Sequence, residues 1–186
     1  NHCVLNGWGW NELKEKYGIC LVLTRTHVHM DKYPACYTRV RIKTWPENGI
    51  KPIFTRYFEI ENAETGERYG YAAVQCMIMD MVSRSRVRPD TLNLPEFGTF
   101  NIEPPCNGVP KLTIKKELLN RTENKLHRRT PVYTDLDYNG HVNNSKYVEW
   151  VCDLFTPGFY SKNIVEEIDI KYHKEIKFGE EVVMEM

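Results

Sequence analysis

Residues 134–147 read TDLDYNGHVNNSKY, and this stretch says more about the chain than any other. The apolar positions after its start have helical spacing: Tyr147, Val148, Val151, Leu154 and Phe155. We therefore predict a helix from about residue 143 that Pro157 and Gly158 end, with Asn143 or Asn144 as its N-cap.

The loop before this helix has the composition of an active site. Asp137, Asn139 and His141 alternate along it and lead into a helix N-terminus, where free backbone N–H groups and the helix dipole favour an oxyanion or a polarised carbonyl. The alternative is an Asx-rich turn that only satisfies backbone amides, which is the usual role of any single Asn or Asp. Turn formation requires neither His141 nor two acids at alternate positions, Asp135 and Asp137. Gly140 indicates a close backbone approach.

Residues 135–147 resemble the active-site loop of acyl-ACP thioesterases, whose pattern reads Asp-Leu-Asp-x-Asn-x-His-Val-Asn-Asn-x-x-Tyr. The similarity extends over nearly the whole chain, because residues 18–88 resemble the first domain of that family and residues 168–183 resemble the strand pair after the helix. The resemblance implies an α+β fold of two tandem hotdog domains, each a long helix wrapped by an antiparallel sheet.

Composition limits the classes of protein that fit. With 186 residues, 41% of them hydrophobic, the chain can bury the core of one large domain or two small ones. Its 25 acidic and 25 basic side chains give no net charge, so no global charge favours nucleic acid. No apolar run approaches the roughly 18 residues of a membrane helix, and the first residues do not resemble a secretory or transit segment. We expect a soluble, cytoplasmic protein.

The cysteines and the two ends of the chain lead to two further expectations. The six cysteines show no CxxC or other metal-ligand spacing, so we expect free thiols in a reducing cytosol. The chain starts at Asn1 without an initiator Met and ends at Met186 inside an alternating strand pattern. We expect that both ends are truncated and that the first repeat lacks its opening strand.

Strand patterns dominate the first half of the chain, and turn residues separate the runs 21–30, 38–45, 53–61 and 68–81. This order predicts an antiparallel meander. Val4, Leu5, Trp8 and Leu13 suggest a helix end before it, so that helix precedes strands in both halves. Residues 86–111 contain five prolines and few periodic apolar positions, which predicts an extended surface linker. The predicted domains are residues 1–88 and 112–186, joined by a linker at 89–111.

An internal repeat relates residues 28–40 to residues 170–182 by a constant shift of 142. Lys32 coincides with Lys174, and Tyr33 takes the place of Glu175. Under the same shift, the counterpart of Asp137 would fall before residue 1. We therefore predict that the candidate carboxylate exists only in the second repeat and that catalysis is asymmetric between the halves.

The resembled family also implies a catalytic set. Its loop Asp, Asn and His and a Glu after the next strand correspond here to Asp137, Asn139, His141 and Glu175. We assign the activation of water to Asp137 or Glu175, proton relay or charge stabilisation to His141, and the binding of water or carbonyl to Asn139. Plant members have a Cys after that Glu, where this chain has Ile176, so we expect no cysteine nucleophile.

The function that the resemblance implies is hydrolysis of fatty acyl thioesters on acyl carrier protein (ACP), which releases a free fatty acid and ends chain elongation. The partner would be acyl carrier protein with its phosphopantetheine-linked acyl chain, and Arg84, Arg86 and Arg88 offer a basic stretch for an acidic carrier. We expect no metal and no organic cofactor in the reaction, no nucleic acid and no membrane insertion. The resemblance also allows a homodimer.

Two other functions remain open at this stage. One is an acyl-CoA thioesterase, in which the phosphopantetheine is carried by a nucleotide. The other is a noncatalytic module that binds acyl chains, although binding alone requires no set such as Asp137, Asn139, His141 and Glu175.

One further pattern concerns metals. His27 and His29 alternate in a predicted strand, which places both imidazoles on one face and could suit a metal ion. No third ligand is spaced nearby in the sequence, so a polar strand face is the favoured interpretation.

Overall fold

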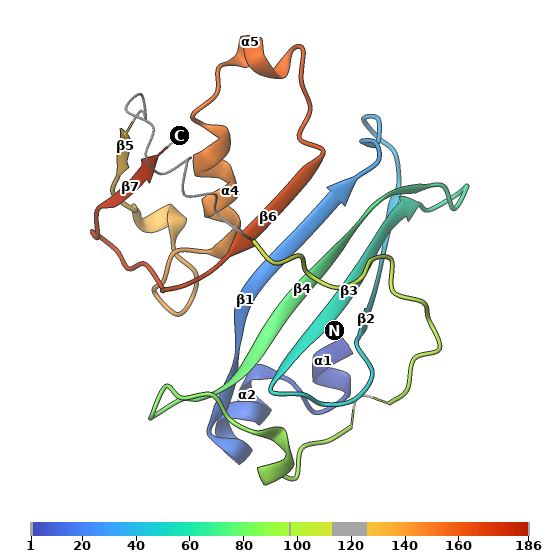
Figure 1. The fold of residues 1–186 in the computed structure, drawn as a ribbon, viewed down its shortest axis with the longest axis vertical. Coiled ribbons are helices and arrows are strands. Elements are labelled where there is room, and N and C mark those ends of the chain that lie inside the picture. The colour runs from blue at the N-terminus through green and yellow to red at the C-terminus, as the bar shows by residue number, and fades with distance from the viewer. Residues whose placement is uncertain (1, 97, 113–125, 186) are drawn as a thin grey trace. The chain divides into compact units, whose positions relative to one another are not determined.

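The computed structural model describes residues 2–96, 98–112 and 126–185 (Figure 1). Contacts divide these residues into two compact units. The described part of the first unit is residues 2–112, except residue 97, together with 165–172. The described part of the second unit is residues 126–164 together with 173–185. The start of the predicted C-terminal domain therefore falls partly on residues 113–125, which lie outside the described residues. The predicted domain boundaries stay a prediction.

The first unit is built on a five-stranded antiparallel sheet in the order β2-β3-β4-β1-β6 (Figure 1). Its strands are β1 (Ile19–Met30), β2 (Val40–Pro46), β3 (Ile53–Asn62), β4 (Arg68–Asp80) and β6 (Glu167–Lys171). The predicted meander is confirmed for β2, β3 and β4. Asn62 closes the β3–β4 turn because its side-chain oxygen accepts hydrogen bonds from the backbone N–H groups of Glu64 and Thr65.

Short helices precede this sheet where the sequence suggested a helix end. They are α1 (His2–Leu5), α2 (Trp10–Glu12) and a π-helical turn, Leu13–Tyr17, that ends at Gly18 with φ 65°. Among the described residues the order of helix then strands holds, but no long helix is present before β1. The positive φ explains Gly18, because an L-residue there would be strained.

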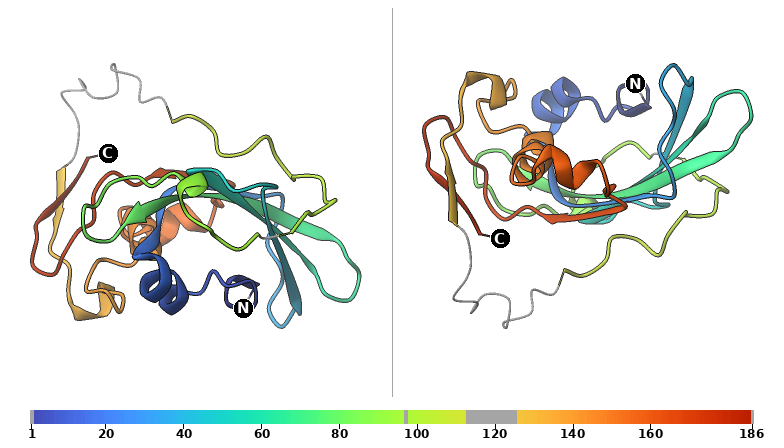
Figure 2. Two further views of the ribbon diagram at one scale, coloured as in Figure 1. Left: turned by 90° about the horizontal axis from the view of Figure 1, so that it is seen from below. Right: turned by 90° about the horizontal axis from the view of Figure 1, so that it is seen from above.

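The two faces of the sheet carry different cores. One buried cluster consists of Trp8, Leu13, Ile19, Phe54 and Ile78, and the other of Trp45, Tyr57 and Ala73. Phe54 and Tyr57 are three positions apart on β3, so their side chains point to opposite faces. Figure 2 shows the N-terminal helices on one side of the sheet and the chain around residues 100–112 on the other.

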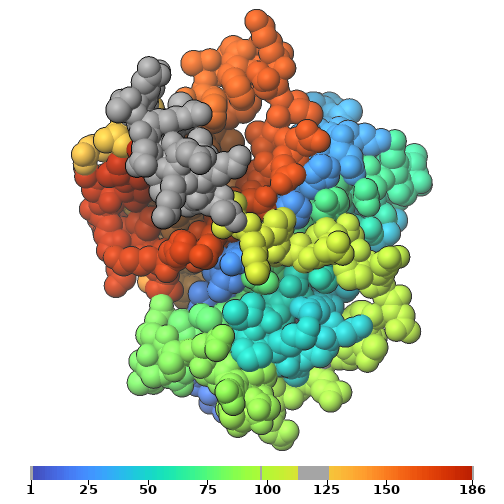
Figure 3. Space-filling view, in the orientation of Figure 1, coloured from blue at the N-terminus to red at the C-terminus, as the bar shows by residue number. Residues whose placement is uncertain are grey.

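The predicted linker, residues 89–111, packs on these cores as it crosses the unit. Leu92, Leu94 and Phe100 contact the first cluster, and the indole Nε1 of Trp8 donates to the carbonyl of Pro95 at 2.7 Å. Cys106 contacts the second cluster. Figure 3 shows the chain around residues 100–112 lying across the sheet. The segment is mostly exposed, as expected, but its apolar side chains anchor it.

The described residues of the second unit form two short strands, two α-helices and a 3₁₀ turn at Tyr133–Asp135. Strand β5 (Leu126–Arg129) pairs with β7 (Val182–Glu185), and the helices are α4 (Asn144–Cys152) and α5 (Pro157–Tyr160). Strands β6 and β7 were expected as a pair, but β6 pairs with β1 instead. None of the described helices has the length and hydrophobicity needed to cross a membrane.

The end of α4 also differs from the prediction. The helix stops at Cys152, and Pro157 begins α5 rather than ending α4. Proline suits the first turn of a helix because the missing N–H has no helical partner there. The Thr156 hydroxyl oxygen caps α5 by accepting from the backbone N–H of Phe159, and the Tyr160 hydroxyl donates to the carbonyl of Cys152.

Burial on β4 can be tested by truncation. The change Ile78→Ala should lower the free energy of unfolding by about 2–5 kcal/mol, because it leaves a cavity in the cluster around Trp8. Ile42→Ala on β2 is the matched control and should cost no more than about 0.5 kcal/mol, since 63% of Ile42 is exposed and Ile78 is fully buried. Urea unfolding followed by tryptophan fluorescence measures both, and equal costs would contradict the described core.

Candidate active site

A buried carboxylate fixes the base of the loop before α4. Asp135 is only 3% exposed, its Oδ2 accepts from the backbone N–H of Val132 at 2.9 Å, and its carbonyl accepts from the backbone N–H of Asn143 at 2.8 Å. These bonds tie both ends of the loop together. Asp135, one of the two acids at alternate positions in the loop, therefore has a structural role.

Asp137 organises the turn itself. Its Oδ1 accepts from the backbone N–H of Asn139 at 2.8 Å and of His141 at 3.2 Å, and its own N–H donates to the carbonyl of His141 at 2.8 Å. A bridge between Leu136 and Val142 continues this pairing. The Asx turn that was the alternative interpretation is therefore present, and it holds His141 in place.

Gly140 is needed for a different reason from the one expected. Its φ is 77°, a conformation that strains L-residues, and a Cβ built there would have no atom within 4 Å. The predicted close backbone approach is wrong. The glycine allows the backbone to reverse direction before His141, where its N–H donates to the carbonyl of Asp137.

Backbone pairing brings His141 to Glu175. His141 forms a bridge with Lys177, and the N–H of Val142 donates to the carbonyl of Ile176 at 2.8 Å. As a result, His141 Nε2 lies 3.6 Å from Glu175 Oε2, with 25% and 38% of the two side chains exposed. An ionisable pair that is partly accessible in this way can meet both water and a substrate.

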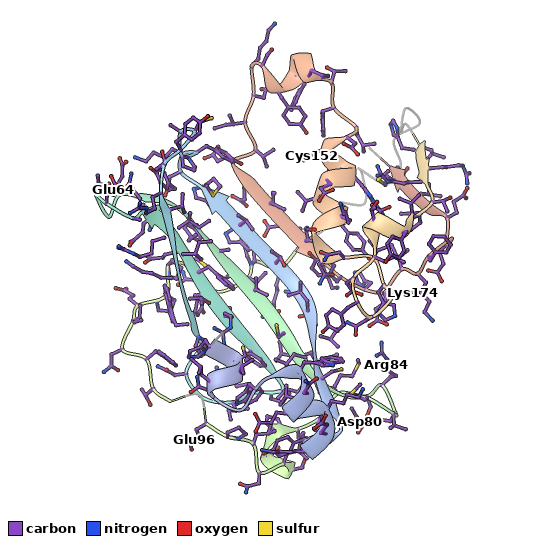
Figure 4. The ribbon with its side chains drawn as sticks, turned by 180° about the vertical axis from the view of Figure 1, so that it is seen from behind. Glu64, Asp80, Arg84, Glu96, Cys152 and Lys174 are labelled. Carbon is purple, nitrogen blue, oxygen red and sulfur yellow. The ribbon has the colours of Figure 1, made fainter. Side chains whose placement is uncertain are left out.

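The segment that carries Glu175 is fixed by a second turn. The carboxylate of Glu180 accepts from the N–H of Lys177 at 3.1 Å, and the N–H of Glu180 donates to the carbonyl of Lys177 at 3.2 Å. Figure 4 labels Lys174 at the start of this segment, which follows β6. Both partners of the His141–Glu175 pair are thus held by side-chain carboxylates bonded to backbone amides.

Asn139 has a less defined place in the candidate set. It lies on the exposed part of the turn, and its backbone N–H is bonded to Asp137. The structure thus brings Asp137, His141 and Glu175 together through direct contacts and leaves Asn139 at the accessible edge of the same turn.

Tyr33 is the equivalent of Glu175 in the sequence repeat, and the two residues have different surroundings in the structure. The hydroxyl of Tyr33 donates to the carbonyl of Val165 at 2.6 Å, whereas Glu175 pairs with His141. The same shift of 142 relates His27 to Asp169, which face each other in the β1–β6 pairing. Residues equivalent by sequence thus meet across these two strands, as in a unit with an internal two-fold axis.

Comparison with known proteins gives the class of this arrangement. The structure resembles an acyl-ACP thioesterase from Bacteroides thetaiotaomicron, with a TM-score of 0.79 at 24% identity over 97% of this chain and 70% of that one. The 12:0-ACP thioesterase from Umbellularia californica matches with a TM-score of 0.67 at 22% identity over 92% and 63%. The fold is the α+β hotdog fold of these enzymes, as predicted.

Sequence models identify the family. The acyl-ACP thioesterase N-terminal domain matches residues 1–93, and the acyl-ACP thioesterase C-terminal domain matches residues 118–186. The chain belongs to the acyl-ACP thioesterase family, and the resemblance seen in the loop is confirmed.

Curated relatives agree with this family. They include a palmitoyl-acyl carrier protein thioesterase of Arabidopsis thaliana, 27% identical over 176 residues, and a dodecanoyl-[acyl-carrier-protein] hydrolase of Cinnamomum camphora, 25% identical over 179 residues. Each alignment covers 91% of this chain but only 42% and 45% of the relatives, respectively. The chain therefore spans less than half the length of these relatives.

The N-cap of α4 is the testable part of this local geometry. Asn143 is the cap, because its side-chain oxygen accepts from the N–H of Ser145 at 3.0 Å. Asn143→Ala should lower the free energy of unfolding of this unit by about 1 kcal/mol, while Asn144→Ala, one position inside the helix, should change it by less than about 0.5 kcal/mol. Hydrogen exchange of the α4 amides would measure both, and a larger effect at Asn144 would refute the assignment.

Proposed function

We propose that this protein hydrolyses fatty acyl thioesters carried on acyl carrier protein. The observation that carries the proposal is the 3.6 Å approach of His141 Nε2 to Glu175 Oε2, beside a turn that contains Asp137 and Asn139. Membership of the acyl-ACP thioesterase family supports the substrate class. Thioester hydrolysis requires a base for water and donors for the developing oxyanion, and this turn and Glu175 together offer groups of both kinds.

In the proposed mechanism Glu175 is the general base. Its carboxylate takes a proton from a water molecule as the water oxygen attacks the thioester carbonyl carbon. The proton passes from Glu175 Oε2 to His141 Nε2, and His141 delivers it to the sulfur when the C–S bond breaks. The side-chain amide of Asn139 donates to the carbonyl oxygen and stabilises the negative charge of the tetrahedral intermediate.

Asp137 has a positioning role in this proposal. Its Oδ1 already accepts two backbone N–H groups, from Asn139 and His141, which fixes it to the turn. A carboxylate that already accepts two backbone N–H groups is a poor candidate for a base that must approach water. We therefore propose Glu175, whose Oε2 lies 3.6 Å from His141 Nε2, as the base, where the sequence left Asp137 and Glu175 as alternatives.

The thiols fit a mechanism without a cysteine nucleophile. Ile176 follows Glu175, and Cys152 lies in α4, as labelled in Figure 4. Burial raises the pKa of Cys76 to about 11 and also raises the pKa of Cys106. Because the thiolate is the reactive form, a raised pKa makes both thiols poorer nucleophiles at neutral pH.

For the carrier protein we propose a docking site on the loop after β4. Arg84, Arg86 and Arg88 are all exposed there, and the turn is held by Asp80, whose carboxylate accepts from the backbone N–H groups of Val82 and Ser83. Figure 4 labels Asp80 and Arg84 in this loop. Closely spaced guanidinium groups attract an acidic partner and increase its association rate.

The function is tested by hydrolysis assays on acyl-ACP and on acyl-CoA of the same chain length. The protein should hydrolyse acyl-ACP with the higher kcat/KM, and Glu175→Gln should lower kcat by about 10²–10⁴-fold, because the base is lost. Glu181→Gln is the control, since Glu181 is an exposed carboxylate paired with Arg128. Preference for acyl-CoA would favour the acyl-CoA thioesterase, and acyl binding without any turnover would favour the noncatalytic module.

The role of Asp137 is tested by two substitutions at one position. Asp137→Asn keeps an oxygen that can accept the two N–H groups and should keep kcat within about 10-fold of the unchanged protein. Asp137→Ala removes the acceptor, and the misplaced His141 should then cost about 10²-fold in kcat. Equal losses in both variants, with unchanged circular dichroism, would instead assign the charge of Asp137 to the chemistry.

A further inference from the structure

A β-bulge in β1 turns two histidines to a common face. The register between β1 and β4 shifts between Leu23 and Arg25, so odd-numbered residues before and after the bulge point to opposite faces. Before it, Leu21 packs on the cluster around Trp8. After it, His27 and His29 pair with Ala73 and Tyr71 and share the face of the second cluster, which contains Ala73.

Strand β6 places two carboxylates opposite these imidazoles. Asp169 pairs with His27, and Glu167 pairs with His29, so the four side chains occupy one face of two adjacent strands. We call this group the acid–imidazole cluster: His27, His29, Glu167 and Asp169. The sequence offered no third ligand because these carboxylates lie about 140 residues further along the chain and meet β1 only through strand pairing.

The distances suit a single metal ion. His27 Nδ1 lies 2.9 Å from Asp169 Oδ1, and His29 Nδ1 lies 3.9 Å from Glu167 Oε2. Ligand atoms of His27, Glu167 and Asp169 all lie within 4.8 Å of one another, the one group of this kind among the described residues. Zinc bonds of about 2.0–2.2 Å place tetrahedral ligand atoms about 3.3–3.6 Å apart. His29 lies outside the 4.8 Å group, so its side chain and that of Glu167 would move to complete a four-ligand site.

A further carboxylate, that of Asp31, supports His29 from the other side of its ring. Its Nε2 lies 3.3 Å from Asp31 Oδ1, and the other oxygen of Asp31 accepts from Arg68 Nε at 3.2 Å. Asp31 can thus orient the ring of His29 through Nε2, while Nδ1 faces the carboxylate of Glu167. A carboxylate behind a histidine is also the usual support of a zinc ligand.

The ring of Tyr71 and the next residue pair define the limits of the cluster. Tyr71 stacks on His29 with ring centroids 5.2 Å apart and lies 5.7 Å from the ring of His27, which restricts both imidazoles. The next pair along the strands, Arg25 opposite Lys171, is cationic. A metal ion would therefore lie toward Glu167 and Asp31, away from Arg25.

We propose that His27, His29, Glu167 and Asp169 bind one divalent metal ion of the zinc class, with Asp31 orienting His29. Imidazole and carboxylate together are ligands that zinc prefers. Such an ion would join β6 to β1. Strand β6 belongs to the segment matched by the C-terminal domain of the family and β1 to that matched by the N-terminal domain. The ion is structural and takes no part in the proposed hydrolysis at Glu175.

The binding test uses the whole protein after treatment with a chelator and dialysis. Isothermal titration with ZnCl₂ should show one equivalent bound, and the melting temperature should rise with Zn²⁺ concentration. Co²⁺ as a probe should give the intense visible absorption of four-coordination without the near-ultraviolet band of thiolate ligation. That spectrum separates this cluster from the six cysteines as the binding site.

Substitutions then identify the ligands. His29→Gln and Glu167→Gln should each weaken Zn²⁺ binding at least tenfold, and Asp31→Asn should weaken it about 10–100-fold through its support of His29. His173→Gln and Glu181→Gln, which replace exposed residues of the same types elsewhere, are the controls and should bind as the unchanged protein does. His27 is left intact because it is 5% exposed, and its loss would disturb the sheet.

Three results would overturn the proposal. The first is no Zn²⁺ binding at about a hundredfold molar excess of metal by a protein with native circular dichroism. The second is binding that His29→Gln and Glu167→Gln leave unchanged, which would place the ion elsewhere. The third is a Co²⁺ spectrum dominated by thiolate ligation.

Discussion

The antiparallel pairing of β6 with β1 is the constraint on which much of this structure depends. Five consecutive residue pairs, from Arg25 with Lys171 to His29 with Glu167, fix its register. A shift of one residue would turn every side chain of β6 to the other face, and the contact between His27 and Asp169 would be lost. Because the shift of 142 relates His27 to Asp169, the two repeats meet at equivalent residues.

The candidate active site relies on backbone order in the same way. Asp135 and Asp137 use their carboxylates to hold the loop, and the pairing of residues 141–142 with 176–177 sets the separation between His141 and Glu175. Carboxylates bonded to backbone N–H groups keep a turn rigid without a large hydrophobic core. The loop and the segment after β6 therefore present a partly exposed ionisable pair, as general acid–base chemistry requires.

The pair of His141 and Glu175 supports hydrolysis, and membership of the acyl-ACP thioesterase family limits the substrate class. The chain spans less than half the length of these curated relatives. Its chemistry therefore depends on the side chains present at this site. Those groups are a carboxylate, an imidazole and an amide around one turn. A thiol at the position of Ile176 would have suggested a covalent intermediate, whereas the pair of His141 and Glu175 is suited to the activation of water.

The sequence by itself determined the strands β1 to β4, the loop at 134–147 and the helix after the loop, because hydrophobic period, turn residues and capping residues act over a few positions. The family followed from the resemblance of that loop to a known motif. Only the tertiary structure decided that Asn143 rather than Asn144 caps α4 and that Asp135 holds the loop. It also showed that Gly140 adopts a positive φ. It also decided that β6 joins β1 and brings Asp169 and Glu167 to two histidines. Strand partners and hydrogen-bond acceptors depend on residues far apart in the chain. Local sequence patterns do not indicate which of these distant groups come into contact.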